Sequence, residues 1–300
     1  MGNLHESLDF TVRLSSAKEK NPALANFLID LKESSAVALI IQIPQVYGLL
    51  LNDHQWTTTM RLRCYLWPYN LPNDLQCSCG KQLTFSHLLS CNRYITYRTC
   101  MHDAVRDQIH AMCKSYKIES FVEPLLRYLE PSNNCNVEKQ NQFFGKRRAD
   151  VVVPSSSDKL FVVDVVSVDV CKKTSLKDAL SETSLLDISE QAKQDKYKKP
   201  LLALKHVKHV EYELCSFDVS NLRTFRKSAM NFLNDFGKIV KNRMNKRFDH
   251  MLWLNRIVFT IFKTVPLIIS KALLAVSAFY EDKAVVRFDS DGCCFNDIKF

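Results

Sequence analysis

The amino-acid sequence predicts an α/β fold, in which a small mixed sheet is flanked by helices and follows an N-terminal helical module. Two valine-rich runs, 148–154 and 159–168, are separated by a polar segment, 155–158, and this pattern predicts a β-hairpin. A third run, 209–217, alternates like a strand, and most of the remaining chain repeats its apolar residues at helical spacing. The 6 glycines and 9 prolines in 300 residues argue against a low-complexity or all-β chain.

The other elements follow in chain order from the same patterns. The expected helical segments are 21–51 (with a break at Pro44), 56–66, 102–116, 119–129, 176–199, 223–247 and 251–280, and a last strand is expected at 284–288. The segment 130–142 has turn and linker composition, so a domain boundary is expected there. We therefore expect a helical domain at 1–130 and an α/β domain with basic C-terminal helices at 143–300.

Composition limits the compartment and the partners. With 46% hydrophobic residues the chain can bury a substantial core. The odd number of cysteines, 11, and the absence of a signal pattern in residues 1–18 favour a reducing compartment, nuclear or cytoplasmic, over secretion. The apolar segment 251–280 is interrupted by Arg256, Lys263 and Lys271, whose charges are costly in a bilayer, so we expect a buried helix and no membrane partner.

Four residues form a Cys-x-Cys-(x7)-His-(x3)-Cys pattern: Cys77, Cys79, His87 and Cys91. Three thiolates and one imidazole satisfy tetrahedral zinc completely, which leaves no open position for a substrate. Gly80 allows the tight turn that follows the first pair, and the (x3) spacing puts His87 and Cys91 about one turn apart on a helix. The pattern predicts a structural zinc knuckle at 77–91.

Two aspartates, Asp150 and Asp164, lie in the predicted hairpin. Asp164 shares a strand face with valines, so a divalent metal, a lysine or an exposed strand end must compensate its charge. If the strands pair, the two carboxylates can approach each other and share one hard cation, magnesium or manganese. Such an ion polarises a phosphodiester and activates water, and a lysine from the helix at 192–199 can stabilise the developing charge.

Basic residues are clustered, although the net charge of +9 is moderate. Between Arg223 and Arg247 there are eight Lys or Arg residues against the single acid Asp235, in a stretch with helical apolar spacing. Such a face suits a phosphate backbone, although a solvated helix surface gives the same pattern. The residues predicted on this ground to bind nucleic acid are Lys146, Arg147, Arg148, Arg223, Arg226 and Lys227.

The order of these features resembles the C-terminal portion of non-LTR retrotransposon polyproteins that carry a restriction-like endonuclease. The similarity covers most of the chain. The matching segments are Arg61-Leu62-Arg63-Cys64-Tyr65-Leu66 with Pro68, the knuckle, Arg98-(x3)-His102, Glu123-Pro124, Arg148-Ala149-Asp150-Val151-Val152-Val153, Val162-Val163-Asp164-Val165 and Ala192-Lys193-(x2)-Lys196-Tyr197.

The resemblance implies a nuclease of the PD-(D/E)xK type that nicks DNA by metal-dependent hydrolysis. Asp150 and Asp164 would be the ligands of magnesium or manganese, and Lys193 or Lys196 the catalytic cation, with Tyr197 in support. Arg98 and His102 match the basic pair of the family, which is expected to contact nucleic acid. DNA is the expected partner, with RNA of the parent element as a second one.

The sequence departs from the family at two positions. Ala149 stands where the family usually has proline, and Val166 takes the place of the lysine in the (D/E)xK triplet, a role that a helix lysine is expected to take over.

Only ~55 residues precede Trp56, fewer than the roughly 100–200 of an ordinary domain, so we expect a fragment without the polymerase. The alternatives are a catalytically dead nucleic-acid-binding remnant and a structural protein whose knuckle only joins helices.

Overall fold

A computed structural model describes a large part of the chain. The described residues are 12, 15–16, 19, 51–63, 76–77, 79–84, 87, 91–126, 148–155, 159–168, 185–208, 211–220, 225 and 227–279. The named elements are α4 (Asp53–Arg63), the 3₁₀ turn η1 (Asn92–Tyr94), α6 (Ile95–Ser115), β1 (Phe121–Val122), β2 (Val151–Pro154), β3 (Lys159–Val168), α8 (Leu185–Lys208), β4 (Glu211–Ser220), α9 (Lys227–Met244) and α10 (His250–Phe279).

The described strands form one mixed sheet in the order β1-β2-β3-β4. β1 pairs antiparallel with β2, and β2 pairs antiparallel with β3, where Val151 lies opposite Val163. β3 and β4 are parallel along their whole length, and α8 makes the crossover between them that a parallel pair requires. The predicted hairpin and the predicted α/β class with a small mixed sheet are therefore confirmed.

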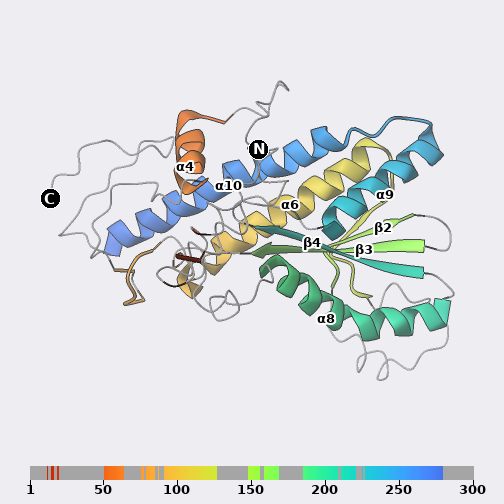
Figure 1. Cartoon of the computed structure of the whole chain (residues 1–300), viewed down its shortest axis with the longest axis horizontal. Helices are drawn as coiled ribbons and strands as arrows, with labels where there is room; N and C mark the ends of the chain where they lie inside the picture. Colours follow the sequence, from red (N-terminus) through yellow and green to blue (C-terminus); the bar gives the residue numbers. More distant parts are fainter. Residues whose placement is uncertain are drawn as a thin grey trace.

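Helices cover both faces of the sheet (Figure 1), with α8 on one face and α6 and α9 on the other, and α10 packs on α6 and α9 on the side away from the sheet. Both faces of β3 are buried, which explains why its sequence is a nearly continuous run of apolar residues. Val163 and Val165 belong to the core under α6, α9 and α10, whereas Val162 packs with Tyr197 and Leu201 of α8. Since alternate side chains share a face, Asp164 is directed toward α8.

Aromatic side chains dominate the larger core. The ring centroids of Phe232 and Phe236 on α9 are 6.1 Å apart, and Phe232 also meets Phe161 of β3 edge to face. Phe236 continues the contacts to Tyr116 and to Phe248. This chain of rings joins α9 to the sheet and to the segment before α10, and such aromatic pairs stabilise beyond their buried area.

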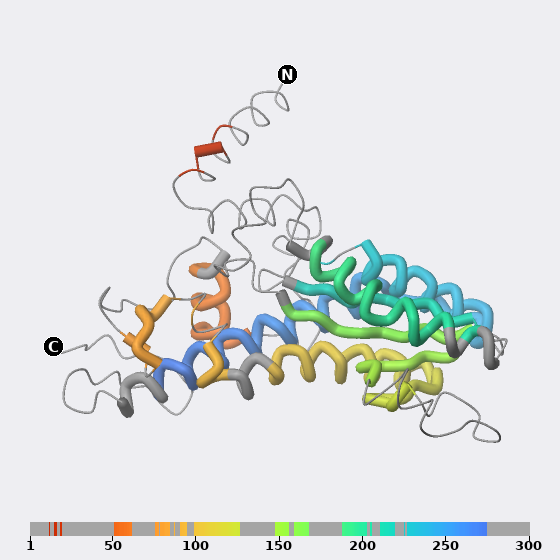
Figure 2. The backbone as a smooth tube through the Cα atoms, turned by 90° about the horizontal axis from the view of Figure 1, so that it is seen from below, coloured from red at the N-terminus to blue at the C-terminus, as the bar shows by residue number. Residues whose placement is uncertain are grey.

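Helices α6 and α10 pack against each other along the long axis of the molecule (Figure 2). α4 packs on α10, where His54 Nε2 lies 3.1 Å from Ser270 Oγ. Cys77 and Cys91 of the predicted knuckle belong to the same core cluster as the sheet residues under α6, and β1 pairs with β2. The expected boundary at 130–142 lies outside the described residues, but the described parts of 1–130 and 143–300 share one core.

The described residues differ from two of the sequence predictions. The helix expected at 119–129 is wrong in its described part, because Phe121 and Val122 pair with β2 and Glu123 ends the strand with a φ of 49°. α8 continues through Pro200, where a helix end was expected, because Pro200 is buried and Leu201 packs on the sheet. The expected start at 176, the segment 21–50 and the strand at 284–288 lie outside the described residues.

In the part of the chain that the structure describes, α10 is the one helix long and apolar enough to cross a membrane. In this fold 67% of its most apolar window is buried. α10 packs against α6 and α4.

Replacing Phe236 by alanine removes the ring that links α9 to Tyr116 and Phe248. We expect Phe236→Ala to lower the free energy of unfolding by about 3–5 kcal/mol, through lost burial and a cavity. Urea unfolding measures the change as a lower midpoint at a similar slope. The control is Leu267→Ala, because Leu267 is 52% exposed on α10 and surface changes stay within about 0.5 kcal/mol. Similar midpoints for both variants would contradict this account of the core.

Candidate functional site

The Cys77–Gly80 segment forms a tight turn. The backbone N–H of Gly80 donates to the carbonyl of Cys77 at 2.8 Å, and the N–H of Cys77 donates to Lys81 at 2.8 Å. Gly80 has a φ of 81°, a conformation that a residue without Cβ adopts without strain. The turn brings the side chains of Cys77 and Cys79 together, as the position of Gly80 predicted.

His87 and Cys91 are linked by a backbone hydrogen bond of α-helical spacing. The N–H of Cys91 donates to the carbonyl of His87 at 2.8 Å, which is the hydrogen bond of one α-helical turn. The N–H of His87 is bonded to Thr84 Oγ1 at 3.1 Å, so the turn is held at its start. The chain then enters η1 and α6 directly, and the site is continuous with the helix that packs on α10.

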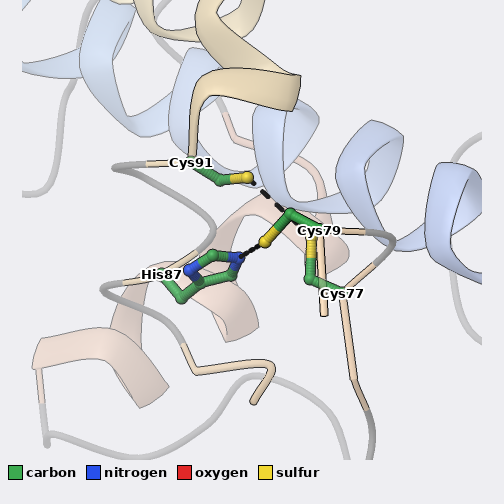
Figure 3. Close-up of side chains that lie close together, drawn as sticks. All are labelled: Cys77, Cys79, His87 and Cys91. Carbon is green, nitrogen blue, oxygen red and sulfur yellow. Dashed lines mark hydrogen bonds between the residues drawn. The ribbon is translucent and has the colours of Figure 1, made fainter. Parts of the chain in front are cut away.

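The four side chains converge on one point (Figure 3). Their ligand atoms all lie within 4.8 Å of one another, with Cys77 Sγ 3.8 Å from Cys91 Sγ and Cys79 Sγ 3.3 Å from His87 Nε2. Zinc–sulfur bonds of about 2.3 Å in a tetrahedron place two sulfurs roughly 3.8 Å apart, which agrees with the sulfur pair. The Cys-Cys-His-Cys cluster can therefore bind a metal such as zinc.

The surroundings favour a thiolate at Cys77. Burial raises the pKa of this thiol, but hydrogen bonds with the Tyr94 hydroxyl, the Cys79 backbone and the side chains of His87 and Cys79 together outweigh burial, and the pKa falls to about 6. Burial raises the pKa of Cys91, and the neighbouring Cys77 raises it further. A negative charge at Cys77 therefore opposes a second one at Cys91. A bound metal ion would stabilise both thiolates at once.

The second group of predicted site residues lies around Asp164, which is only 3% exposed. The Tyr197 hydroxyl lies 2.5 Å from Asp164 Oδ1 and 2.7 Å from the carbonyl oxygen of Arg148. These two acceptors share the single hydroxyl proton. Tyr197 thus ties α8 to the acidic residue of β3 and to the chain just before β2.

The two lysines of α8 approach Asp164 differently. Lys193 Nζ forms a close ion pair with Asp164 Oδ2, and its side chain is 25% exposed. Lys196 Nζ lies 3.7 Å from Oδ1, above the Tyr197 ring at 4.6 Å from the centroid, and its side chain is 43% exposed. Of the three compensations that the sequence left open for Asp164, the structure contains a lysine at direct contact distance.

Asp150 has different partners, although it directly precedes Val151, which pairs with Val163 next to Asp164. Its Oδ2 accepts a hydrogen bond from the backbone N–H of Val165 at 2.6 Å and lies 3.0 Å from His102 Nε2 of α6. The hydrogen bond to Asp150 raises the pKa of His102, against the effect of burial. Asp150 is therefore fixed by β3 and α6, and Asp164 by α8.

The predicted nucleic-acid residues are only partly described. Arg148 is exposed, with Nη1 3.4 Å from Glu123 Oε2, and Lys227 is exposed at the start of α9. His102 contacts Asp150, a contact that the sequence did not predict. Lys146, Arg147, Arg223 and Arg226 lie outside the described residues, as does the side chain of Arg98.

Sequence reasoning missed Asp218, which is 0% exposed on β4. Ser216 Oγ donates a hydrogen bond to Asp218 Oδ1 at 2.5 Å. The signal that singled out Asp164, an acid within an apolar strand pattern, is present here too, because Phe217 and Val219 flank Asp218. The expected strand ended at residue 217, one position too early to include it.

Comparison with known proteins gives no match: no protein-family model and no curated protein matches the chain.

The cluster at 77–91 predicts about one zinc ion per chain. We expect Cys77→Ser to lose the zinc and to unfold at lower temperature, since metal binding contributes to folding. Cys100→Ser is the control, because Cys100 is an exposed cysteine on α6 that is not part of the cluster. Elemental analysis of the purified proteins gives the metal content, and equal zinc in both variants would contradict the assignment.

Replacing Tyr197 by phenylalanine leaves two acceptors without their hydroxyl donor. We expect Tyr197→Phe to lower the free energy of unfolding by about 1–3 kcal/mol, because a buried carboxylate and a carbonyl lose a hydrogen bond. Lys198→Gln, on the exposed face of α8, should change it by less than about 0.5 kcal/mol. Both are compared by urea unfolding, and a Tyr197→Phe midpoint equal to that of the unchanged protein would show that the hydroxyl contributes nothing.

Proposed function

We propose that this chain is a DNA endonuclease that nicks DNA by divalent-metal phosphodiester hydrolysis. Its α/β part would be a restriction-endonuclease-like core of the non-LTR retrotransposon type. The observation that carries the proposal is the meeting of Asp164 with Lys193 and Tyr197 across β3 and α8. The resemblance implies Asp150, Asp164, either Lys193 or Lys196, and Tyr197 as the site residues, and the contacts of Asp164 with Lys193 and Tyr197 support it.

The donor atoms of the acidic pair fit a hard cation. Asp150 directly precedes β2, Asp164 directly follows Val163, the partner of Val151, and their carboxylate oxygens suit magnesium or manganese. Such an ion, when bound, polarises a phosphodiester and lowers the pKa of an attacking water. Charged and hydroxyl side chains of α8 contact Asp164.

The geometry favours Lys193 over Lys196 as the catalytic cation. Lys193 is the less exposed of the two and is in direct contact with Asp164. An ammonium fixed in a partly buried site stabilises developing negative charge more strongly than one in water. Lys196 is more exposed and contacts the Tyr197 ring and hydroxyl, so we assign it a supporting role with Tyr197.

His102 acts in this proposal as a positioning residue. It holds Asp150 Oδ2 from α6, while the Val165 amide holds the same oxygen from β3. The other ring nitrogen, Nδ1, lies 3.1 Å from Asp103 Oδ1, which fixes the plane of the imidazole. Asp150 is thus oriented by two groups that would not themselves contact a cation.

Exposed cations provide a surface for the phosphate backbone. On α8 they include Lys198, Lys199 and Lys205, and at the end of α9 and after it Lys241, Arg243, Lys246 and Arg247. Each such contact adds salt-dependent affinity by counterion release. The zinc knuckle has no free ligand position in this proposal and serves as a structural module next to α6.

A nucleic-acid-binding protein without catalysis is the second candidate. It is favoured by the full engagement of the Asp164 carboxylate, whose two oxygens already contact Lys193, Lys196 and Tyr197. In such a remnant the lysines would neutralise Asp164 permanently. DNA affinity would then remain without cleavage.

Nicking of supercoiled plasmid by the zinc-loaded protein in magnesium or manganese tests the proposal. We expect Asp164→Asn and Lys193→Gln each to reduce the rate by about 100-fold or more, the size expected for loss of a group that stabilises charge in the transition state. Lys196→Gln should reduce it by less than about tenfold, since its contact with Asp164 is longer and more exposed.

Asp195→Asn is the matched control, because Asp195 is an exposed carboxylate on the same helix. It should nick at the rate of the unchanged protein. Equal nicking by Asp164→Asn would exclude the acidic site as its source. Salt-dependent DNA binding by an unchanged protein that does not nick would select the second candidate.

A further inference from the structure

A third carboxylate, that of Asp218, lies on the face of the sheet that carries Asp164. In the parallel pairing of β3 with β4, Asp164 is opposite Ser216 and Val166 is opposite Asp218. Asp218 is therefore a diagonal neighbour of Asp164, with its side chain toward α8. Its side chain is 0% exposed, so no bulk water solvates the carboxylate.

One oxygen of Asp218 is left without a partner. Ser216 Oγ donates to Oδ1, but Oδ2 is buried and accepts no hydrogen bond from any described residue. Burying an unpaired carboxylate oxygen is costly, and native proteins retain such an atom where it has a further role or a bound ion. Asp218 Oδ2 thus requires a positive or hydrogen-bonding partner that the described side chains do not supply.

The charged side chains near Asp218 supply too little positive charge to neutralise its carboxylate. Lys193 forms its close contact with Asp164, and Glu190, about one turn earlier on α8, adds a further carboxylate. Burial raises the pKa of Asp218 to about 7, and the hydrogen bond from Ser216 only partly offsets it. Glu190 and Asp164 raise this pKa as well, while Lys193 lowers it, so all three charges act on the Asp218 carboxyl.

We infer that Asp218 is a ligand of a divalent cation that it shares with Asp164 on the α8-facing side of β3 and β4. A cation at this position supplies the positive charge that Lys193 alone does not, and it gives Asp218 Oδ2 a partner. Carboxylate oxygens select a hard ion such as Mg²⁺ or Mn²⁺. The inference rests on the proposed function, because it takes Asp164 as a cation ligand, and it assigns to the same ion a carboxylate of β4.

Binding of Mn²⁺ to the zinc-loaded protein without DNA tests this inference separately from cleavage. Electron paramagnetic resonance measures the free Mn²⁺ during a titration, and no chelator is used, since a chelator would also remove zinc. We expect Asp218→Asn and Asp164→Asn each to weaken Mn²⁺ binding at least tenfold. Asp195→Asn is the control and should bind Mn²⁺ like the unchanged protein.

Thermal unfolding shows whether each variant is folded. Without Mn²⁺, Asp218→Asn should unfold at the same or a higher temperature than the unchanged protein, because it no longer buries a carboxylate that lacks a partner. It should also lose the rise in unfolding temperature that Mn²⁺ gives the unchanged protein. Asp218→Ser is the second variant, since it removes the same carboxylate with a smaller side chain. If one of the two variants does not fold, the other is used for the Mn²⁺ titration.

The outcomes separate the two proposals. Unchanged Mn²⁺ affinity in Asp218→Asn, with loss in Asp164→Asn, overturns the role of Asp218 and leaves the proposed nuclease intact. If the unchanged protein binds no Mn²⁺ at all, the metal-dependent function fails together with this inference. Loss of binding in both variants, with both folded, supports a cation held by β3 and β4.

Discussion

A carboxylate buried on a covered face of a sheet needs a positive charge or hydrogen-bond donors beside it. The arrangement of the fold around Asp164 depends on this requirement. At 3% exposure its charge cannot be solvated by water. Its partners, Lys193 and Tyr197, come from one helix, so α8 must cross β3 at a fixed height and rotation. The parallel pairing of β3 and β4 brings α8 there, because α8 connects these two strands. The topology and the polar cluster therefore depend on each other.

The two faces of the sheet differ in what packs on them. One face is covered by the main apolar core, and the other contains the buried polar groups. On the side of α6, α9 and α10, a continuous aromatic and aliphatic core buries most of the large side chains. On the α8 side the apolar cluster is much smaller, and it lies beside charged and hydroxyl groups. Buried polar groups cost stability unless they are paired. Burial in the larger core stabilises the fold enough to offset this loss of stability. The opposite face can therefore contain an acidic group.

Local patterns in the sequence predicted the elements whose signals lie within a few residues of one another. The β2–β3 hairpin follows from two valine-rich runs, and the metal-binding cluster follows from ligand spacing with Gly80 at the turn. β1 was missed because a two-residue edge strand exists only through its pairing with β2. Pro200 suggested a helix end, but packing on the sheet overrides this local preference.

Contacts between distant residues carry no such signal. His102 and Asp150 are 48 positions apart, and their hydrogen bond depends on how α6 lies against the sheet edge. The same holds for Asp218, whose place beside Asp164 depends on the register of a parallel pair. Sequence reasoning can identify an acid in an apolar strand, but the strand pairing decides which acids meet.

Because α6 begins a few residues after Cys91, this helix sets the position of the cysteine cluster relative to Asp150. Cys91 lies just before η1, α6 begins at Ile95, and His102 follows about two turns later at the 3.6 residues per turn of an α-helix. Both the distance and the angular phase between the cluster and Asp150 are thus set by a count of residues. One inserted residue in these two turns would rotate His102 by about 100° away from Asp150, whereas a conservative side-chain change there would leave the phase intact. Within this stretch, chain length is under stricter structural control than chemical identity.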